Sequence, residues 1–393
     1  MPATGRSYVI AGAGIAGLTL ALTLAKFGAT VVVLERNPVL QEFGAGLQIS
    51  PNARRILDRL GLGDAIAGVS LEPAALDIYP RGRERPLVSL ELGRIMRERF
   101  GAPYAVMHRA DLANLLYKAC RRFANIDILF GVRNWDVVSH ARGVTVAIDE
   151  AGGQTRNSRA LAFIGADGVH SQTRQQMLDG SAARFGRRIA WRCLVPADLV
   201  AGQIAPDRVS VFFGSGFHLV CYPLPHRQQV NLALFMPSAH PDGGKDVPAV
   251  ARPGARMETI LAAAGAGWTP WPLFTVETAS WHRGNIGLIG DAAHAMVPFQ
   301  AQGAAMGIED AAVLGPLLVN EKSAEAALRR YAEIRRPRTG RVAALSANNG
   351  RIFHLPWPLS RGRDLVMRLQ GPRAHLGRLG WIYGYDAEDT GRH

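Results

Sequence analysis

A glycine-rich turn near the start of the chain constrains the fold more than any other feature. Residues 7–11 read SYVIA and predict a buried strand, GAGIAG follows at 12–17, and VVVLE at 31–35 predicts the next strand. The small residues between them predict a helix, so the order strand, turn, helix, strand indicates a βαβ unit. In such a unit Gly12 allows a tight turn, Gly14 lets the backbone approach a pyrophosphate, and Gly17 lets the helix pack on the strand. The pattern therefore predicts a Rossmann-type dinucleotide site at Gly12, Gly14, Ile15, Ala16 and Gly17.

An acidic residue supports this interpretation. Glu35 ends the second predicted strand, 21 residues after Gly14. A carboxylate at this point of a dinucleotide site accepts hydrogen bonds from the ribose hydroxyls. Because the turn contacts only the ADP half of a dinucleotide, this motif leaves the choice between NAD and FAD open.

A second turn of similar chemistry lies in the last third of the chain. Residues 287–314 read GLIGDAAHAMVPFQAQGAAMGIEDAAVL, in which an apolar run ends at Asp291 and small residues lead to a helix that begins near Gln302. A flavin dinucleotide is long enough to need two places of close backbone approach. The start of a helix also stabilises negative charge on a reduced flavin. The second turn therefore favours FAD.

The pattern of residue types in the chain changes between these two turns. From residue 184, β-branched and aromatic runs alternate with turn residues, which predicts an antiparallel sheet. We predict an α/β fold, in which a Rossmann-type FAD-binding domain carries an inserted antiparallel β-sheet substrate domain and a C-terminal helical tail. The expected segments are 1–183 for the first part of the FAD-binding domain, 184–280 for the substrate domain, with a loop and short helix at 237–265, and 281–393 for the rest. Pro337 is expected to interrupt the tail.

Composition narrows the classes of partner. The formal net charge is +13, but only four of the 45 basic residues are lysines and the arginines are scattered, so nucleic acid is not expected. Three widely spaced cysteines and no histidine or carboxylate cluster predict neither a disulfide framework nor a metal site. The first residues lead directly into a strand pattern, and glycines interrupt the uncharged stretch that follows. We therefore expect a cytoplasmic protein that does not bind membranes.

Several longer motifs extend over nearly the whole chain. They are ER at 35–36, GAGLQISPNA at 44–53, HRADL at 108–112, GADGVHSQTR at 165–174, GDAAHAMVPFQAQGAAMGIEDA at 290–311 and WIYGYDA at 381–387. Together with the glycine turn, they resemble the single-component (class A) FAD-dependent aromatic hydroxylases, especially salicylate hydroxylase-like and 6-hydroxynicotinate monooxygenase-like members.

The resemblance implies roles for individual residues. Arg36 and Arg109 would contact FAD phosphate or ribityl groups, Asp291 would hold the ribityl chain, and Gln48 would lie beside the flavin. Asp167 would belong to the motif that serves both FAD and the nicotinamide cofactor. Pro298 would lie where oxygen reacts at the flavin edge. The residues that would cradle the ring are Gly303, Ala304 and Ala305.

The resemblance also implies a reaction. NADH or NADPH would reduce FAD, O₂ would add to form a flavin C4a-hydroperoxide, and a small phenol- or hydroxypyridine-carboxylate-like aromatic substrate would be hydroxylated. The choice between NADH and NADPH stays open, and a homodimer is compatible with the sequence. The alternatives are a flavin-dependent reductase or halogenase on the same fold, or a non-catalytic FAD-binding redox sensor.

The chain departs from the family at points that bear on the catalytic base. Phe299 stands where some members carry histidine, and Cys193 stands where glycine is common. In HLVCYPL, the alternation of a strand places His218 and Tyr222 on one face together with Val220. Either His218 or Tyr222 is our candidate for contact with the substrate and for the base. The alternative is that both belong only to a half-buried sheet face.

Overall fold

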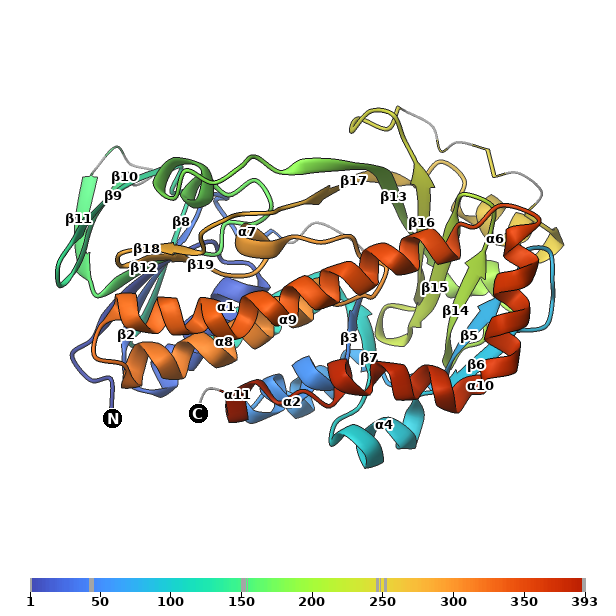
Figure 1. The fold of residues 1–393 in the computed structure, drawn as a ribbon, viewed down its shortest axis with the longest axis horizontal. Helices are drawn as coiled ribbons and strands as arrows, with labels where there is room; N and C mark the ends of the chain where they lie inside the picture. The colour runs from blue at the N-terminus through green and yellow to red at the C-terminus, as the bar shows by residue number, and fades with distance from the viewer. Residues whose placement is uncertain are drawn as a thin grey trace.

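The computed structural model describes residues 2–41, 46–149, 155–244 and 253–390, together with the single positions 153, 247, 249 and 250. These residues form two parts that lie side by side along the long axis, and a long C-terminal helix runs beside both (Figure 1). The predicted α/β fold, with its inserted sheet and helical tail, is confirmed. No helix of the part described here is long and apolar enough to cross a membrane.

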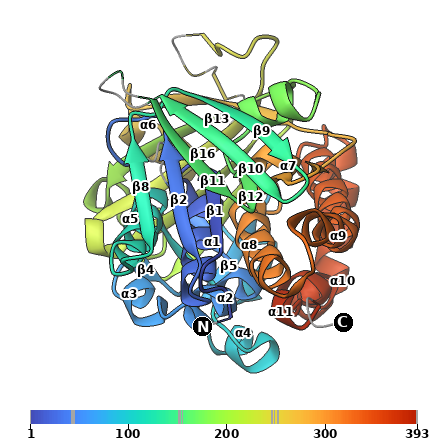
Figure 2. The ribbon, with the colours of Figure 1, turned by 90° about the vertical axis from the view of Figure 1, so that its left-hand side faces the viewer.

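The first part is built on a six-stranded sheet. Its neighbouring strands are parallel except for the edge pair β18–β19. In sheet order they are β18 (His282–Arg283), β19 (Ile286–Leu288), β12 (Ala162–Gly165), β1 (Ser7–Ala11), β2 (Thr30–Glu35) and β8 (Ile126–Phe130). The helices that pack around this sheet include α1 (Ile15–Lys26), α5 (Arg109–Cys120) and α8 (Gly303–Asn320). Figure 2 views the molecule from this end.

Two small sheets complete this part. The strands β9 (Asn134–His140), β10 (Gly143–Asp149) and β11 (Thr155–Ala160) form an antiparallel sheet, and a second one contains β3 (Gly46–Ile49), β7 (Ala105–His108) and β4 (Ser70–Leu71). The shorter helices beside them are α2 (Pro51–Arg59), α3 (Gly63–Ala67) and α4 (Gly93–Phe100).

The second part is a seven-stranded sheet with an apolar cluster on each face. In sheet order its strands are β17 (Thr269–Thr275), β13 (Arg184–Pro196), β16 (Gln229–Pro237), β15 (His218–Leu224), β14 (Arg208–Phe213), β5 (Ala75–Tyr79) and β6 (Val88–Glu91). The helix α6 (Ala255–Ala264) packs against it. The expected antiparallel pairing holds except between β14 and β5, which are parallel. This sheet also takes β5 and β6 from residues 75–91, far from the expected segment 184–280.

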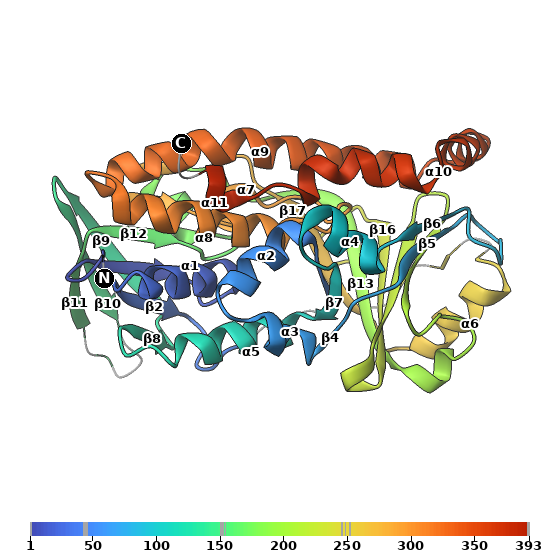
Figure 3. The same cartoon turned by 90° about the horizontal axis from the view of Figure 1, so that it is seen from below.

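The C-terminal helices differ from expectation at a proline. The helix α9 (Ala324–Phe353) continues through Pro337, so the predicted interruption there is wrong. Arg335 and Arg338 lie on either side of this proline, and both form buried ion pairs with α8. These pairs hold the helix across the point where the proline lacks an N–H donor. Figure 3 shows α9 extending along both parts of the molecule.

The remaining elements follow or connect these helices. They are α7 (Asp291–His294), α10 (Leu359–Tyr383), α11 (Ala387–Thr390), the π-helical turn η1 (Thr173–Met177) and the 3₁₀ turns η2 (Ala197–Val200) and η3 (Pro225–Arg227). The chain bends within α10 at Gly371, whose φ of 66° lies in the left-handed region.

Candidate active site

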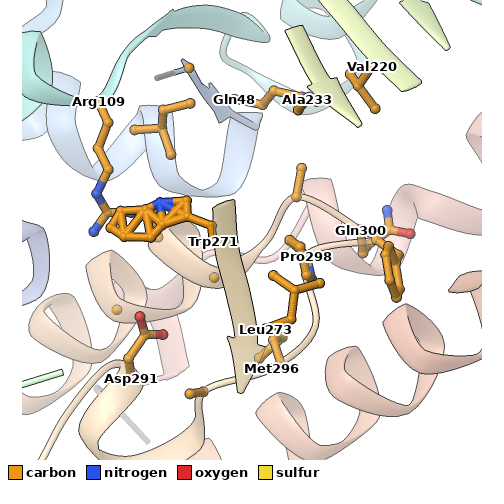
Figure 4. Close-up of a pocket in the computed structure, with 18 of the residues that line it drawn as sticks. Gln48, Arg109, Val220, Ala233, Trp271, Leu273, Asp291, Met296, Pro298 and Gln300 are labelled. Carbon is orange, nitrogen blue, oxygen red and sulfur yellow. The ribbon is translucent and has the colours of Figure 1, made fainter. Parts of the chain in front are cut away.

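A cavity of about 1650 Å³ lies between the carboxyl ends of the parallel strands and the seven-stranded sheet. The segments that follow β1, β2, β12 and β19 line one side, and β13, β15 and β16 line another. Ligands of open parallel sheets bind at this edge. Figure 4 shows Val220, Ala233 and Gln48 near one another, with Pro298 and Met296 across the pocket. The cavity is large enough to hold a dinucleotide and a small ring together.

Most of the predicted site residues meet in this cavity. Those that line it are Gly12, Gly14, Ile15, Ala16, Glu35, Arg36, Gln48, Arg109, Asp167, His218, Tyr222, Asp291, Pro298, Gly303 and Ala304. Gly17 and Ala305 lie behind it. A Cβ atom on Gly17 would be 2.0 Å from the Gly12 carbonyl oxygen, and Ala305 is packed in the core. These two residues are therefore placed to pack the helices α1 and α8.

Close packing of α1 on α8 explains part of the small-residue run in the second turn. A Cβ on Gly307 would be 2.9 Å from the Ala16 side chain, and one on Gly290 would be 3.0 Å from the same group. The sequence predicted that a flavin approaches the backbone closely at this turn. The structure shows that helix packing requires two of its small residues.

Both helix starts are arranged to receive a ligand. The N-cap residues Gly14 of α1 and Gln302 of α8 make no side-chain capping bond. The first amides of each helix therefore remain available for an anionic or hydrogen-bonding group. At Gly303 no heavy atom lies within 4 Å of the place of a Cβ, so a ligand can approach the backbone. These features fit FAD, with α1 at the pyrophosphate and α8 near the ring.

Two acidic residues predicted to bind the cofactor, Glu35 and Asp167, have hydrogen-bond partners within the protein. Glu35 accepts hydrogen bonds from the backbone N–H groups of Ala13, at 3.0 Å, and Asn37, at 2.9 Å. It thus fixes the turn after β1 and still has lone pairs for ribose hydroxyls. Asp167 accepts from Ser171 Oγ at 2.6 Å and from the Thr173 N–H at 2.9 Å. Asp167 therefore organises the turn at η1, beside the cavity.

A buried set of charges supports the loop that carries Asp291. We call Glu309, Asp310, Arg335, Arg338 and His294 the α8–α9 ion network. Asp310 Oδ2 accepts from the Gly290 N–H at 2.8 Å and lies 2.6 Å from His294 Nε2, while Arg335 Nε donates to Asp310 Oδ1 at 2.7 Å. Although burial alone would raise the pKa of Asp310, His294 and Arg335 hold it below its usual range. The exposed Asp291 side chain at this loop faces the cavity.

The two candidates on β15 are electrically neutral. Burial lowers the pKa of His218 well below its usual range, and neighbouring His354 and Arg188 lower it further. Burial raises the pKa of Tyr222 above its usual range. Tyr222 is thus a phenol that can donate a hydrogen bond, whereas a neutral His218 has one ring nitrogen that can accept a proton. The structure places both on the cavity wall.

An arginine that the sequence left without a role also lines the cavity. Arg192 on β13 has no hydrogen bond or ion pair with any residue that the structure describes, and its guanidinium lies 5.5 Å from the centre of the Trp271 ring. Burial and the nearby Arg109 lower the pKa of Arg192 to about 10, so it is still charged at neutral pH. A cation without an ion-pair partner in this cavity favours an anionic ligand. The signal in the sequence is the single arginine of the apolar run AWRCLVP, residues 190–196.

The described ranges contain no group of three His, Cys, Asp or Glu side chains that could hold a metal ion.

Comparisons with known proteins show the family of the chain. The FAD binding domain family matches residues 7–191 and 256–346. The chain is 32% identical to 3-hydroxybenzoate 6-hydroxylase 1 of Aquipseudomonas alcaligenes, over 96% of this chain and 97% of the relative. It is 35% identical to a 3-amino-4-hydroxybenzoate 2-monooxygenase of Streptomyces platensis, over 97% and 96%. A salicylate hydroxylase substrate complex shares the fold, with a TM-score of 0.79 at 24% identity over 98% of this chain and 97% of that one.

These matches span the whole molecule and include both helix starts and the sheet that closes the cavity. The chain belongs to the FAD binding domain family and, within it, to the class A FAD-dependent aromatic hydroxylases.

Proposed function

We propose that this hydroxylase uses NAD(P)H and O₂ to hydroxylate a small, hydroxybenzoate-like anion. In this proposal Arg192 binds the carboxylate of the substrate, Tyr222 donates a hydrogen bond, and His218 accepts the proton of the ring hydroxyl. When bound, FAD supplies the redox chemistry that activates O₂. The protein orients the ring, excludes water and moves the proton.

The observation that carries the proposal is the unpaired Arg192 on the same sheet face as His218. Arg192 pairs with Ala233, and Ala233 pairs with Val220 on the next strand. Paired residues of neighbouring strands point to one face, and so do residues two apart, so Arg192, Val220 and His218 share a face. Arg192 and His218 are two strands and two residues apart, so their Cα atoms are roughly 12 Å apart. A benzoate ring with a hydroxyl group can bridge side chains at this spacing.

The small side chains between them support the same orientation. Ala233 and Val220 lie between Arg192 and His218 in the sheet and line the cavity, where their small side chains leave room for a flat ring. Figure 4 shows these two residues side by side. Pro298 and Phe299 line the cavity as well, so apolar groups surround the space for the ring. In such a site the attraction between Arg192 and a carboxylate is stronger than in water.

The relatives favour this class of substrate. Two of them act, by name, on 3-hydroxybenzoate and on 3-amino-4-hydroxybenzoate. Both compounds carry a carboxylate and a hydroxyl group on one benzene ring, which are the two groups that Arg192 and His218 would recognise.

Paired substrates test the proposal. We expect Arg192→Met to lower kcat/KM for the preferred hydroxybenzoate by about 10²–10³-fold, because a buried carboxylate would lose its partner. The same variant should change kcat/KM little for the matching phenol that lacks the carboxylate, and Arg192→Lys should retain part of the preference. Equal losses with both substrates, at unchanged FAD content, would show that Arg192 does not recognise the carboxylate.

A further inference from the structure

A second histidine, His354, contacts the ring of His218, which lines the cavity. His354 follows the last residue of α9, and its Nε2 lies 2.7 Å from His218 Nδ1. Both rings are buried. At this distance one nitrogen must donate a proton and the other must accept it, so the tautomers of the two rings are coupled.

The role of His218 as a base requires one direction of this hydrogen bond. His218 Nδ1 is the nitrogen that meets His354, so Nε2 is the nitrogen left to accept a proton from a ligand. A neutral imidazole carries one N–H, so a free lone pair on Nε2 requires the proton of His218 to be on Nδ1. His218 Nδ1–H then donates to Nε2 of His354, and His354 carries its own proton on the buried Nδ1.

This direction leaves His218 Nε2 with its lone pair toward the cavity. Nε2 has no hydrogen-bond partner among the residues that the structure describes, and His218 lines the cavity. We propose that His354 is a positioning residue, which fixes His218 in the tautomer whose Nε2 accepts the proton of the substrate hydroxyl. This inference rests on the function proposed above and assigns the orientation of its base.

Aromatic rings hold the two histidines in place. Phe235 stacks on His218 with ring centres 4.4 Å apart and planes 8° apart, and Phe299 and Phe353 contact it edge-on at 5.4 and 5.5 Å. Phe299 also contacts His354 edge-on at 5.5 Å. The imidazole next to the base therefore comes from the end of α9, and Phe299, which occupies the place of the family's histidine, packs against both rings.

The charged groups that act on this pair are cationic. Arg188 on β13 lowers the pKa of both histidines, and Arg363 on α10 lowers that of His354. In the described part of the chain no carboxylate is found among the groups that shift either pKa. A hydrolase histidine is oriented by an aspartate, whereas His218 is oriented here by a neutral ring.

The proton transfer is balanced within this arrangement. The O–H bond of the substrate hydroxyl breaks, its electron pair stays on the oxygen, and a new N–H bond forms at His218 Nε2. The imidazolium that results keeps its Nδ1–H bond to His354. Because Arg188 disfavours this cation, it is stable only while the anionic substrate is beside it.

The tautomers can be measured directly in the FAD-loaded protein. Long-range ¹H–¹⁵N correlation spectra, with the His218 signals assigned through His218→Phe, should show a proton on Nδ1 and none on Nε2. In His354→Phe we expect both tautomers, and in His354→Gln, whose amide oxygen can also accept, mainly the original one. A proton on Nε2 in the wild-type protein would overturn the inference without need of any variant at position 354.

Turnover measurements distinguish the positioning role of His354 from the proposed role of His218 as the base. We expect His354→Phe to lower kcat/KM for the preferred hydroxybenzoate by about 10–10²-fold, by analogy with partners that orient metal-bound histidines, and His354→Gln to recover most of it. His140→Phe, on an exposed strand of the first part, is the matched control and should not change turnover. If His218→Phe abolishes coupled turnover and His354→Phe has no effect, only the positioning role fails. If neither variant has an effect, the proposed base is wrong as well.

Discussion

The molecule contains two buried polar clusters of opposite kind. In the α8–α9 ion network, beneath the predicted FAD loop, Glu309 and Asp310 pair with Arg335 and Arg338 at 2.6–2.7 Å in the closest ion pairs, and His294 lies 2.6 Å from Asp310. The pair of His218 and His354, at the predicted substrate end, is neutral and enclosed by three phenylalanines. One cluster satisfies its own charges, and the other can receive a proton.

The two clusters therefore have different roles: the α8–α9 ion network supports the backbone, and the pair of His218 and His354 takes part in proton transfer. Buried charges that are paired hold a backbone loop in one position, and the free energy of unfolding falls strongly when one partner is removed. Neutral rings in an apolar pocket contribute little binding energy of their own, but their protonation responds to a ligand. We therefore expect substitutions in the network to affect stability and FAD retention, and substitutions in the pair to affect proton transfer.

The largest effect is expected at His218. His218→Phe should lower coupled hydroxylation by about 10²–10⁴-fold, because a base would be lost. FAD content and the free energy of unfolding should change little, since a ring of similar size fills the aromatic pocket. Product yield, FAD absorbance and urea unfolding measure the three quantities. A normal product yield in His218→Phe would show that His218 is not the base and would contradict the proposed role of the histidine pair in proton transfer.

The next effect is on stability. Arg335→Met should lower the free energy of unfolding by about 3–5 kcal/mol, because Glu309 and Asp310 would remain buried without this partner. We also expect weaker FAD retention, since Asp310 holds the Gly290 amide. Urea unfolding measures the loss. The matched control is Arg330→Met in the same helix, whose exposed ion pair with Glu333 should contribute less than about 0.5 kcal/mol. Similar values for both variants would contradict the role of the network.

A smaller effect is expected for the residue that the network supports. Asp291→Ala should weaken FAD binding by about 10–10²-fold, the value of one charged hydrogen bond to a hydroxyl group. Asp291→Asn should retain more of the affinity, because its amide oxygen can still accept. Fluorescence titration of the apoprotein with FAD gives both dissociation constants. Unchanged affinity for FAD in the alanine variant would show that Asp291 does not bind the cofactor.

The smallest effect concerns acid stability. Burial lowers the pKa of His354 to about 3. Between its unfolded value of about 6.5 and this value, the unfolded chain binds a proton that the folded chain excludes, so the free energy of unfolding falls as the pH falls. The slope is about 1.4 kcal/mol per pH unit. In His354→Phe this part of the slope should disappear, which urea unfolding at pH 6.5, 5.5 and 4.5 will show. An unchanged slope would contradict burial of a neutral His354.

The ion network should respond to acid in a different range. The pKa of Asp310 is held below its usual range, so its contribution is present above the unfolded value of about 3.9 and is lost only as the pH falls further. The contribution of His354 is therefore lost first as the pH falls, and that of Asp310 is lost later.

Local signals made the FAD half predictable. The glycines at 12–17 and the small residues at 287–314 lie next to strand and helix patterns, and the structure brings nearly all the residues predicted there to one cavity. Gly17 was predicted to let the helix pack on the strand, and its contacts with Gly12 and Ala166 fit that role. Ala305 was assigned to the cofactor because packing and ligand contact both favour small side chains.

Long-range contacts account for what the sequence did not predict. The pairing of β5 with β14 joins residues more than 100 positions apart, and the contact between His218 and His354 spans 136 positions. Neither leaves a periodic pattern in the chain. Pro337 was expected to break α9, but ion pairs of the residues beside it override that local preference.

The most direct test of the account is the stoichiometry of the reaction. FAD-loaded protein is supplied with NADH or NADPH, O₂ and a set of hydroxybenzoates, and hydroxylated product and hydrogen peroxide are measured against NAD(P)H consumed. We expect about one product per NAD(P)H for at least one hydroxybenzoate, and mostly peroxide for the phenol that lacks its carboxylate. Peroxide equal to NAD(P)H consumption with every hydroxybenzoate would contradict it.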